Sequence, residues 1–144
     1  MKLVFRIMLG LAVVGIGGYL LLTWMLFGDH SSYGEHLASY ELLPETASDI
    51  SFYRNQNFTG LFIADFAINE TKFLRWSRSL ELQPEVIGEP QTIADARAFS
   101  RGNTAGHHII EHGLYVSRRR ENGGGVDLAY NRDNGRGYIS KSHN

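Results

Sequence analysis

An uninterrupted apolar run near the amino terminus constrains this chain more than any other feature. Ile7 to Phe27 contains no charged residue, and Arg6 stands directly before it. A helix rises about 1.5 Å per residue, so a run of this length reaches roughly 30 Å, the thickness of the hydrocarbon core of a bilayer. The sequence therefore predicts a transmembrane helix over residues 7–27 and places the rest of the chain on one side of a membrane.

Positive charge on the amino side of this run predicts its orientation. Lys2 and Arg6 precede the run, and Asp29 follows it. Because cytoplasmic flanks are enriched in Lys and Arg, we expect the amino terminus in the cytoplasm and the remainder outside it. The predicted location is the plasma membrane (the inner membrane of the cell), crossed once, with the carboxyl-terminal domain outside the cytoplasm.

Two other interpretations of the run stay open. A cleaved signal peptide has a shorter apolar core and small residues before the cut, whereas this run is long and ends in TWMLFG at residues 23–28. The other interpretation is a helix buried in a protein core. We favour an uncleaved anchor, because Tyr19 and Trp24 also suit the membrane interface.

Past the run, the sequence predicts one small domain. The anchor takes residues 1–28, a stalk or linker takes 29–48, and the domain outside the cytoplasm takes 49–144. Ile50 to Arg54 alternates apolar and polar residues, and Phe58 to Ile68 has one face that is almost entirely apolar. Both patterns are typical of strands, and together they predict a hairpin.

A helix is expected to follow this hairpin. Asn69 can cap its start, because an Asn side chain accepts hydrogen bonds from the free amides of a first turn. Phe73, Trp76 and Leu80 then recur at helical spacing, which predicts a stripe that faces the core. The stretch 81–106 is predicted to be irregular, apart from a short helix over 92–99.

The remaining residues predict a meander. Apolar residues alternate with polar or small ones between Gly113 and Lys141, and Asn134-Gly135 is a strong hairpin signal. The predicted fold is α+β: an N-terminal transmembrane helix followed by a small antiparallel sheet with one main helix packed on it. The expected order is strand, strand, helix, irregular segment and three-stranded meander.

The domain resembles small, functionally uncharacterised bacterial membrane-anchored or secreted α+β domains. The segments that carry the resemblance are LPETA at 43–47, IxFY at 50–53, Phe58, Phe66, FLxW at 73–76, and AYNRDNGRGY at 129–138. The resemblance covers most of the domain, but its motifs consist of core and turn residues. It implies the fold and the location and brings no known activity.

Composition excludes several kinds of chemistry. The chain has no cysteine, so disulfides, thiolate metal sites and cysteine nucleophiles are excluded. No Ser or Thr has a base at a spacing that a nucleophile requires. We therefore predict no catalytic residues and expect an accessory or interaction domain rather than an enzyme.

One alternative function is metal binding, or metal-dependent catalysis. In the segment His107-His108-Ile109-Ile110-Glu111-His112, a helix would place His108 and His112 one turn apart, a spacing that lets two imidazoles share a zinc ion. A strand would place them about 13 Å apart, too far for one ion. Because no third ligand has diagnostic spacing, we expect no cofactor, with zinc at His108 and His112 as the alternative.

The second alternative is binding to an anionic surface. Arg118, Arg119 and Arg120 form a basic run, and strand alternation would turn Arg119 away from its two neighbours. The predicted orientation argues against a nucleic acid partner and favours anionic lipid or cell-wall polymer. The competing interpretation is an edge strand protected from aggregation by charge. The expected partners are the membrane, through residues 7–27, and another membrane or envelope protein.

Overall fold

The structure is a computed structural model that describes residues 2–28, 31–56, 60–121 and 123–143. The chain divides into two compact units, Met1–His30 and Ser31–Asn144, and each is treated by itself. Two positions used in the predictions, Asp29 at the start of the expected stalk and Phe58 at the start of the second expected strand, lie outside the described residues.

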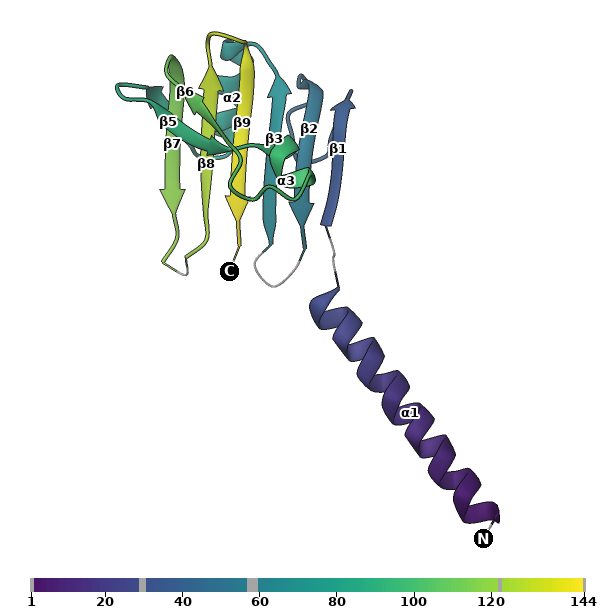
Figure 1. The fold of residues 1–144 in the computed structure, drawn as a ribbon. Coiled ribbons are helices and arrows are strands. Elements are labelled where there is room, and N and C mark those ends of the chain that lie inside the picture. The colour runs from purple at the N-terminus through teal and green to yellow at the C-terminus, as the bar shows by residue number, and fades with distance from the viewer. Residues whose placement is uncertain (1, 29–30, 57–59, 122, 144) are drawn as a thin grey trace. The chain divides into compact units, whose positions relative to one another are not determined.

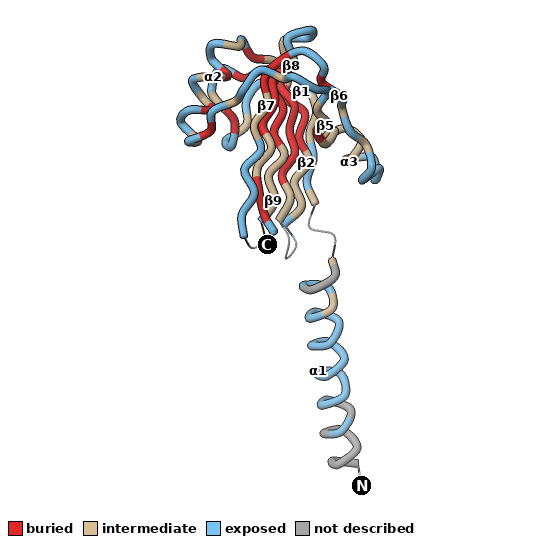
Figure 2. Tube along the Cα trace, turned by 90° about the vertical axis from the view of Figure 1, so that its left-hand side faces the viewer, coloured by how far each residue is buried: buried red, intermediate tan, exposed pale blue. Residues whose placement is uncertain are grey.

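The first unit is a single helix, α1 (Lys2–Phe27). Most of its described apolar side chains are exposed, as the pale colour of the helix in Figure 2 shows. Among the residues that the structure describes, no helix is long and apolar enough to cross a membrane. This finding corrects the transmembrane helix predicted over residues 7–27. The prediction was based on the length of the run, on its lack of charged residues and on Tyr19 and Trp24 near its end.

The second unit is built on a seven-stranded sheet in which every recorded pairing is antiparallel (Figure 1). Its order is β1-β2-β3-β9-β8-β7-β4, so the last strand of the chain lies in the middle. The bounds are β1 Ser31–Leu37, β2 Ser48–Asn55, β3 Leu61–Ala67, β4 Glu85–Val86, β7 Gly113–Arg119, β8 Gly125–Asn131 and β9 Arg136–Ser142.

Smaller elements cover the two faces of this sheet. Helix α2 (Glu70–Ser79) lies on one face. A two-stranded ribbon of β5 (Gln91–Ala94) and β6 (His107–Ile110) lies on the other, together with the short helix α3 (Ala96–Ser100). We call these the α2 face and the ribbon face.

This architecture corrects the predicted fold class. The expected sheet was small and carried one main helix, whereas the described residues form mostly antiparallel sheet, with a second two-stranded sheet and three helices. Residues 31–37, expected within a stalk, form the edge strand β1. The polar sequence SSYGEHL gives no apolar alternation from which to predict a strand. An edge strand can form without it, because it needs backbone pairing but little apolar surface.

The segment 81–106 also differs from its prediction. Thr92, the first residue of the expected short helix, instead pairs with Ile109 in the ribbon, which suits a β-branched residue. Asp95 caps the helix that follows, since its carboxylate accepts a hydrogen bond from the backbone amide of Arg97 at 2.9 Å. The segment therefore contains β4, β5 and α3 rather than an irregular loop with one longer helix.

The main core lies between the sheet and α2. Asn69 caps α2 as its sequence predicted, because its side chain accepts a hydrogen bond from the amide of Thr71 at 2.9 Å. Phe73 on α2 packs its ring against Tyr130 of β8, with 5.3 Å between ring centroids. The side chains with no exposed surface in this core are Ile50, Phe66, Phe73 and Leu128. A second, smaller core under the ribbon contains Ile93, Ile110, Ala129 and Tyr138.

Candidate functional site

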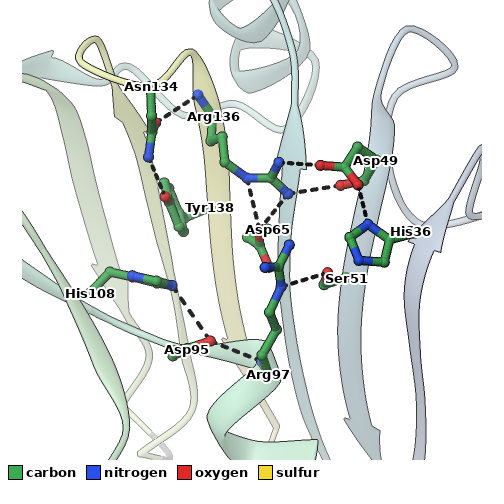
Figure 3. A network of polar contacts seen from close by, with 10 residues as sticks. All are labelled: His36, Asp49, Ser51, Asp65, Asp95, Arg97, His108, Asn134, Arg136 and Tyr138. Carbon is green, nitrogen blue, oxygen red and sulfur yellow. Dashed lines mark hydrogen bonds and ion pairs between the residues drawn. The ribbon is translucent and has the colours of Figure 1, made fainter.

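A polar pocket of about 370 Å³ lies on the ribbon face. Charged and hydroxyl-bearing groups line it, in contrast to the apolar cores on either side (Figure 3). They come from β1, β2, β3, β6, β9, α3 and the turn before β9. The lining residues are His36, Asp49, Asp65, Arg97, His108, Asn134, Arg136 and Tyr138.

Arg136 forms the centre of the network in this pocket. It opens β9 and pairs in register with Ala67 of β3, so its side chain reaches across β3 towards β2. Its guanidinium donates through Nε to Asp65 Oδ2 at 2.9 Å and through Nη1 to Asp49 Oδ2 at 2.6 Å. Nη2 donates to Asp65 Oδ2 and to the backbone carbonyl of Asp49. The arginine therefore ties three strands together on this face.

The two carboxylates of the network differ in their electrostatics. A hydrogen bond from His36 at 2.6 Å, followed by one from Arg136, lowers the pKa of Asp49 to about 2. Asp65 is much less exposed, with 6% of its side chain accessible. Burial raises the pKa of Asp65, although the charge and hydrogen bonds of Arg136 act in the opposite direction.

One oxygen of Asp65 has no partner. Oδ1 is buried and makes no hydrogen bond to any residue that the structure describes. A buried carboxylate oxygen without a donor costs free energy, because it has given up its water. In this pocket it is an acceptor that a bound molecule could satisfy.

Arg97 supplies free donors to the same pocket. The Asp95 cap fixes its backbone, and its Nε donates to Ser51 Oγ at 3.1 Å. Its terminal nitrogens have no hydrogen-bond partner among the described side chains and carbonyls. Figure 3 shows this guanidinium beside Asp65. A guanidinium with a free end binds carboxylate and phosphate groups readily, because its two nitrogens match two oxygens.

Tyr138 and His108 form the ribbon side of the pocket. The Tyr138 hydroxyl accepts a hydrogen bond from Asn134 at 3.0 Å, which leaves its own hydrogen free to donate. Burial raises the pKa of Tyr138, so this hydroxyl stays protonated. The ring of His108 lies 5.1 Å from the Tyr138 ring, and its Nε2 lies 3.5 Å from Asp95 Oδ1.

The structure does not bring the two predicted zinc ligands together. His108 lies on strand β6, whereas His112 follows that strand and lies 3.2 Å from Asp133. The two imidazoles therefore contact different carboxylates. Within the described ranges, no group of three or more His, Asp or Glu side chains could hold a metal ion.

The predicted basic run divides between the two faces of the sheet. Arg119 pairs with Asp127 on the ribbon face, with its Nη2 3.0 Å from both carboxylate oxygens. Arg118 and Arg120 instead line a second pocket on the α2 face, together with Lys141. Alternation along the strand explains the division, as the sequence predicted.

Sequence reasoning missed most of the ribbon-face pocket. Asp65, Arg97 and Arg136 were not among the residues predicted to bind a ligand. The usable signal was the position of Asp65, because a lone carboxylate in the apolar strand LFIADFA needs a buried partner. Nothing local links it to Arg136, which lies 71 residues away, or to Arg97.

Comparison with protein families, with characterised proteins and with solved structures finds no match to this chain. The resemblance to small bacterial α+β domains therefore stays a prediction, and function has to be argued from the pocket itself.

Proposed function

We propose that residues Ser31–Asn144 are a non-catalytic accessory or interaction domain whose ribbon-face pocket binds a small polar ligand. The ligand carries a carboxylate or phosphate group and, beside it, a hydroxyl or ammonium donor. One observation carries this proposal: the free end of Arg97 and the unpartnered Asp65 Oδ1 lie in the same pocket.

The chemistry of the two groups sets the expected binding mode. The anionic group of the ligand accepts hydrogen bonds from Arg97, with the Tyr138 hydroxyl as a further donor. The donor group of the ligand bonds to Asp65 Oδ1 and offsets the cost of its burial. The volume of about 370 Å³ falls within the range of small-molecule sites, roughly 300–1,000 Å³.

The state of the hydroxyl and acidic groups supports a role in binding rather than catalysis. Ser51 is fully buried, and its oxygen accepts a hydrogen bond from Arg97. Asp49 and Asp65 are both engaged by Arg136, so neither stands beside a hydroxyl as a free general base. The absence of catalysis stays a prediction.

The expected location and macromolecular partners also stay predictions. The prediction of a position outside the cytoplasm depends on Lys2 and Arg6 before the apolar run. A function in metal binding at His108 and His112 has less support, because their side chains contact different carboxylates.

Calorimetric titration of the full-length chain tests the proposed pocket. The probes are citrate and glycerol 3-phosphate, which carry an anionic group beside a hydroxyl, and succinate and inorganic phosphate, which have no such hydroxyl; we expect saturable binding of at least one of the first two. Arg97→Ala should abolish this binding, and Arg97→Lys should retain part of it, because lysine keeps the charge but loses the planar pair of donors. Arg101→Ala is the matched control, since Arg101 follows the same helix α3, is exposed and does not line the pocket.

Two results would contradict the proposal. One is that neither citrate nor glycerol 3-phosphate binds the folded wild-type chain. The other is that a bound probe keeps its affinity in Arg97→Ala, because the anion would then be held elsewhere.

A further inference from the structure

The α2 face carries a second pocket that shares no lining residue with the first. This groove of about 350 Å³ lies between the carboxyl end of α2 and the sheet. Apolar side chains form its walls, with Trp76 and Leu82 on one side and Phe62 and Ile139 on the other. Leu82, Phe62 and Ile139 are buried, so the groove opens directly onto the main core.

Charge and apolar surface are separated along this groove by the register of the sheet. One cross-strand row contains Phe62, Lys141, Val126 and Arg118 on β3, β9, β8 and β7. The next row on the same face contains Ala64, Ile139, Leu128 and Val116, which are all apolar. The cations therefore stand at one end of the groove, and the apolar surface lies further inward.

The cations at this end are not neutralised by the protein. Arg120 and Lys141 have no side-chain partner among the residues described, and Arg118 lies only near two carbonyl oxygens at the end of α2, at 3.4 and 3.5 Å. The one carboxylate in the lining, Glu41, lies 3.6 Å from Arg54. The mouth of the groove therefore carries unbalanced positive charge beside an apolar interior.

We propose that this groove binds one molecule of an anionic amphiphile with a single acyl chain. The carboxylate head lies at Arg120 and Lys141, and the chain lies inward against Trp76 and Ile139. Charge complementarity selects an anionic head, and burial of the chain gains about 25 cal/mol for each Å² of apolar surface removed from water.

The strand order argues against a peptide as the occupant. Most of the groove floor comes from β3, β9 and β8, and each of these strands has a neighbour on both sides, whereas β4 covers β7 only at Leu114 and Tyr115. A strand bound over β3, β9 or β8 would therefore find no open edge to pair with, and its backbone groups would be buried without partners. An acyl chain has no such groups.

Trp76 provides a direct readout of binding. The chain has two tryptophans, so Trp24→Phe leaves Trp76 as the only one. In this full-length variant, decanoate below its micelle concentration should change the fluorescence saturably. Decyltrimethylammonium, with a similar tail and the opposite charge, should bind much more weakly, and inorganic phosphate alone should leave the signal unchanged.

Substitutions of the cations at the mouth test whether they bind the carboxylate head of the ligand, and a substitution in the apolar wall tests whether it binds the acyl chain. Arg120→Ala combined with Lys141→Ala should weaken decanoate binding roughly tenfold or more. Leu42→Asn should also weaken it, and because Leu42 is 46% exposed the fold should tolerate the change. Lys72→Ala, an exposed cation of α2 outside the groove, is the matched control and should bind normally.

Several outcomes would overturn the assignment. If decyltrimethylammonium bound with the same affinity as decanoate, the cations at the mouth would have no part in binding. Unchanged decanoate affinity in the Arg120→Ala, Lys141→Ala double variant would lead to the same conclusion. A fluorescence change with vesicles of anionic and zwitterionic phospholipid but none with monomeric decanoate would indicate a membrane surface rather than a single-molecule site.

Discussion

Arg136 offers the most direct test of how the ribbon-face network stabilises the domain. Arg136→Met keeps most of the side-chain length and removes the charge. It leaves Asp65, with 6% of its side chain exposed, as a buried carboxylate whose Oδ1 already lacks a donor. Removing one partner of a buried ion pair costs about 3–5 kcal/mol. Because small domains are stable by about 5–15 kcal/mol, this loss should be large.

A second substitution separates the uncompensated charge from lost packing. In Asp65→Asn combined with Arg136→Met no buried charge of the pair remains, so we expect the double variant to recover much of the stability that Arg136→Met loses. Coupled neighbours show interaction energies of about 0.5–3 kcal/mol in such cycles. The sign of the pH effect also follows. Without the arginine, the pKa of Asp65 lies still further above its unfolded value of 3.8, so Arg136→Met should regain stability as pH falls towards 4.

Urea unfolding of the full-length chain, followed by circular dichroism at pH 7 and pH 4, measures these quantities. Arg132→Met is the matched control, because Arg132 pairs with Glu70 at 2.6 Å but both side chains are substantially exposed. The control should change stability far less. The reasoning is refuted if Arg136→Met costs no more than Arg132→Met, or if the Asp65 and Arg136 substitutions are simply additive.

Three further predictions follow from other residues. Because the pKa of Asp49 is lowered from 3.8 to about 2, its contribution to stability is present above pH 4 and lost as pH falls towards 2; Asp49→Asn should flatten this part of an acid unfolding curve. Gly137→Ala should destabilise by about 1–3 kcal/mol in urea unfolding, because an added Cβ would lie 2.8 Å from the buried ring of Phe66. A zinc chelator should leave the melting temperature unchanged, and a drop that His108→Ala and His112→Ala abolish would restore the zinc alternative.

The elements predicted correctly are those whose sequence signals are local. Asn69 at the cap and Phe73 on the buried stripe locate α2, and the structure places both as expected. The hairpin signal at Asn134-Gly135 likewise marks the turn before β9, where Gly135 adopts a φ of 68°. Capping and turn residues form hydrogen bonds with groups only a few positions away along the chain. A single sequence therefore contains the information needed to predict them.

The elements that were missed depend on partners distant in sequence. β1 has little apolar alternation and is held by pairing with β2. Threonine is a residue type that often caps helices, but the pairing of Thr92 with Ile109 in the ribbon decides its conformation. The network around Asp65 shows the same limit, since a buried carboxylate predicts that a cation exists without saying where in the chain it is.

The central position of β9 explains why one thin domain can hold two chemically different pockets. This last strand lies between β3 and β8, and its side chains alternate between the faces. Arg136 and Tyr138 point into the polar pocket, whereas Ile139 and Lys141 line the groove. A slip of one residue in β9 would exchange these sets, placing the arginine in the apolar core and the isoleucine against the carboxylates. The ion pair with Asp65 therefore also fixes the register on which the groove depends.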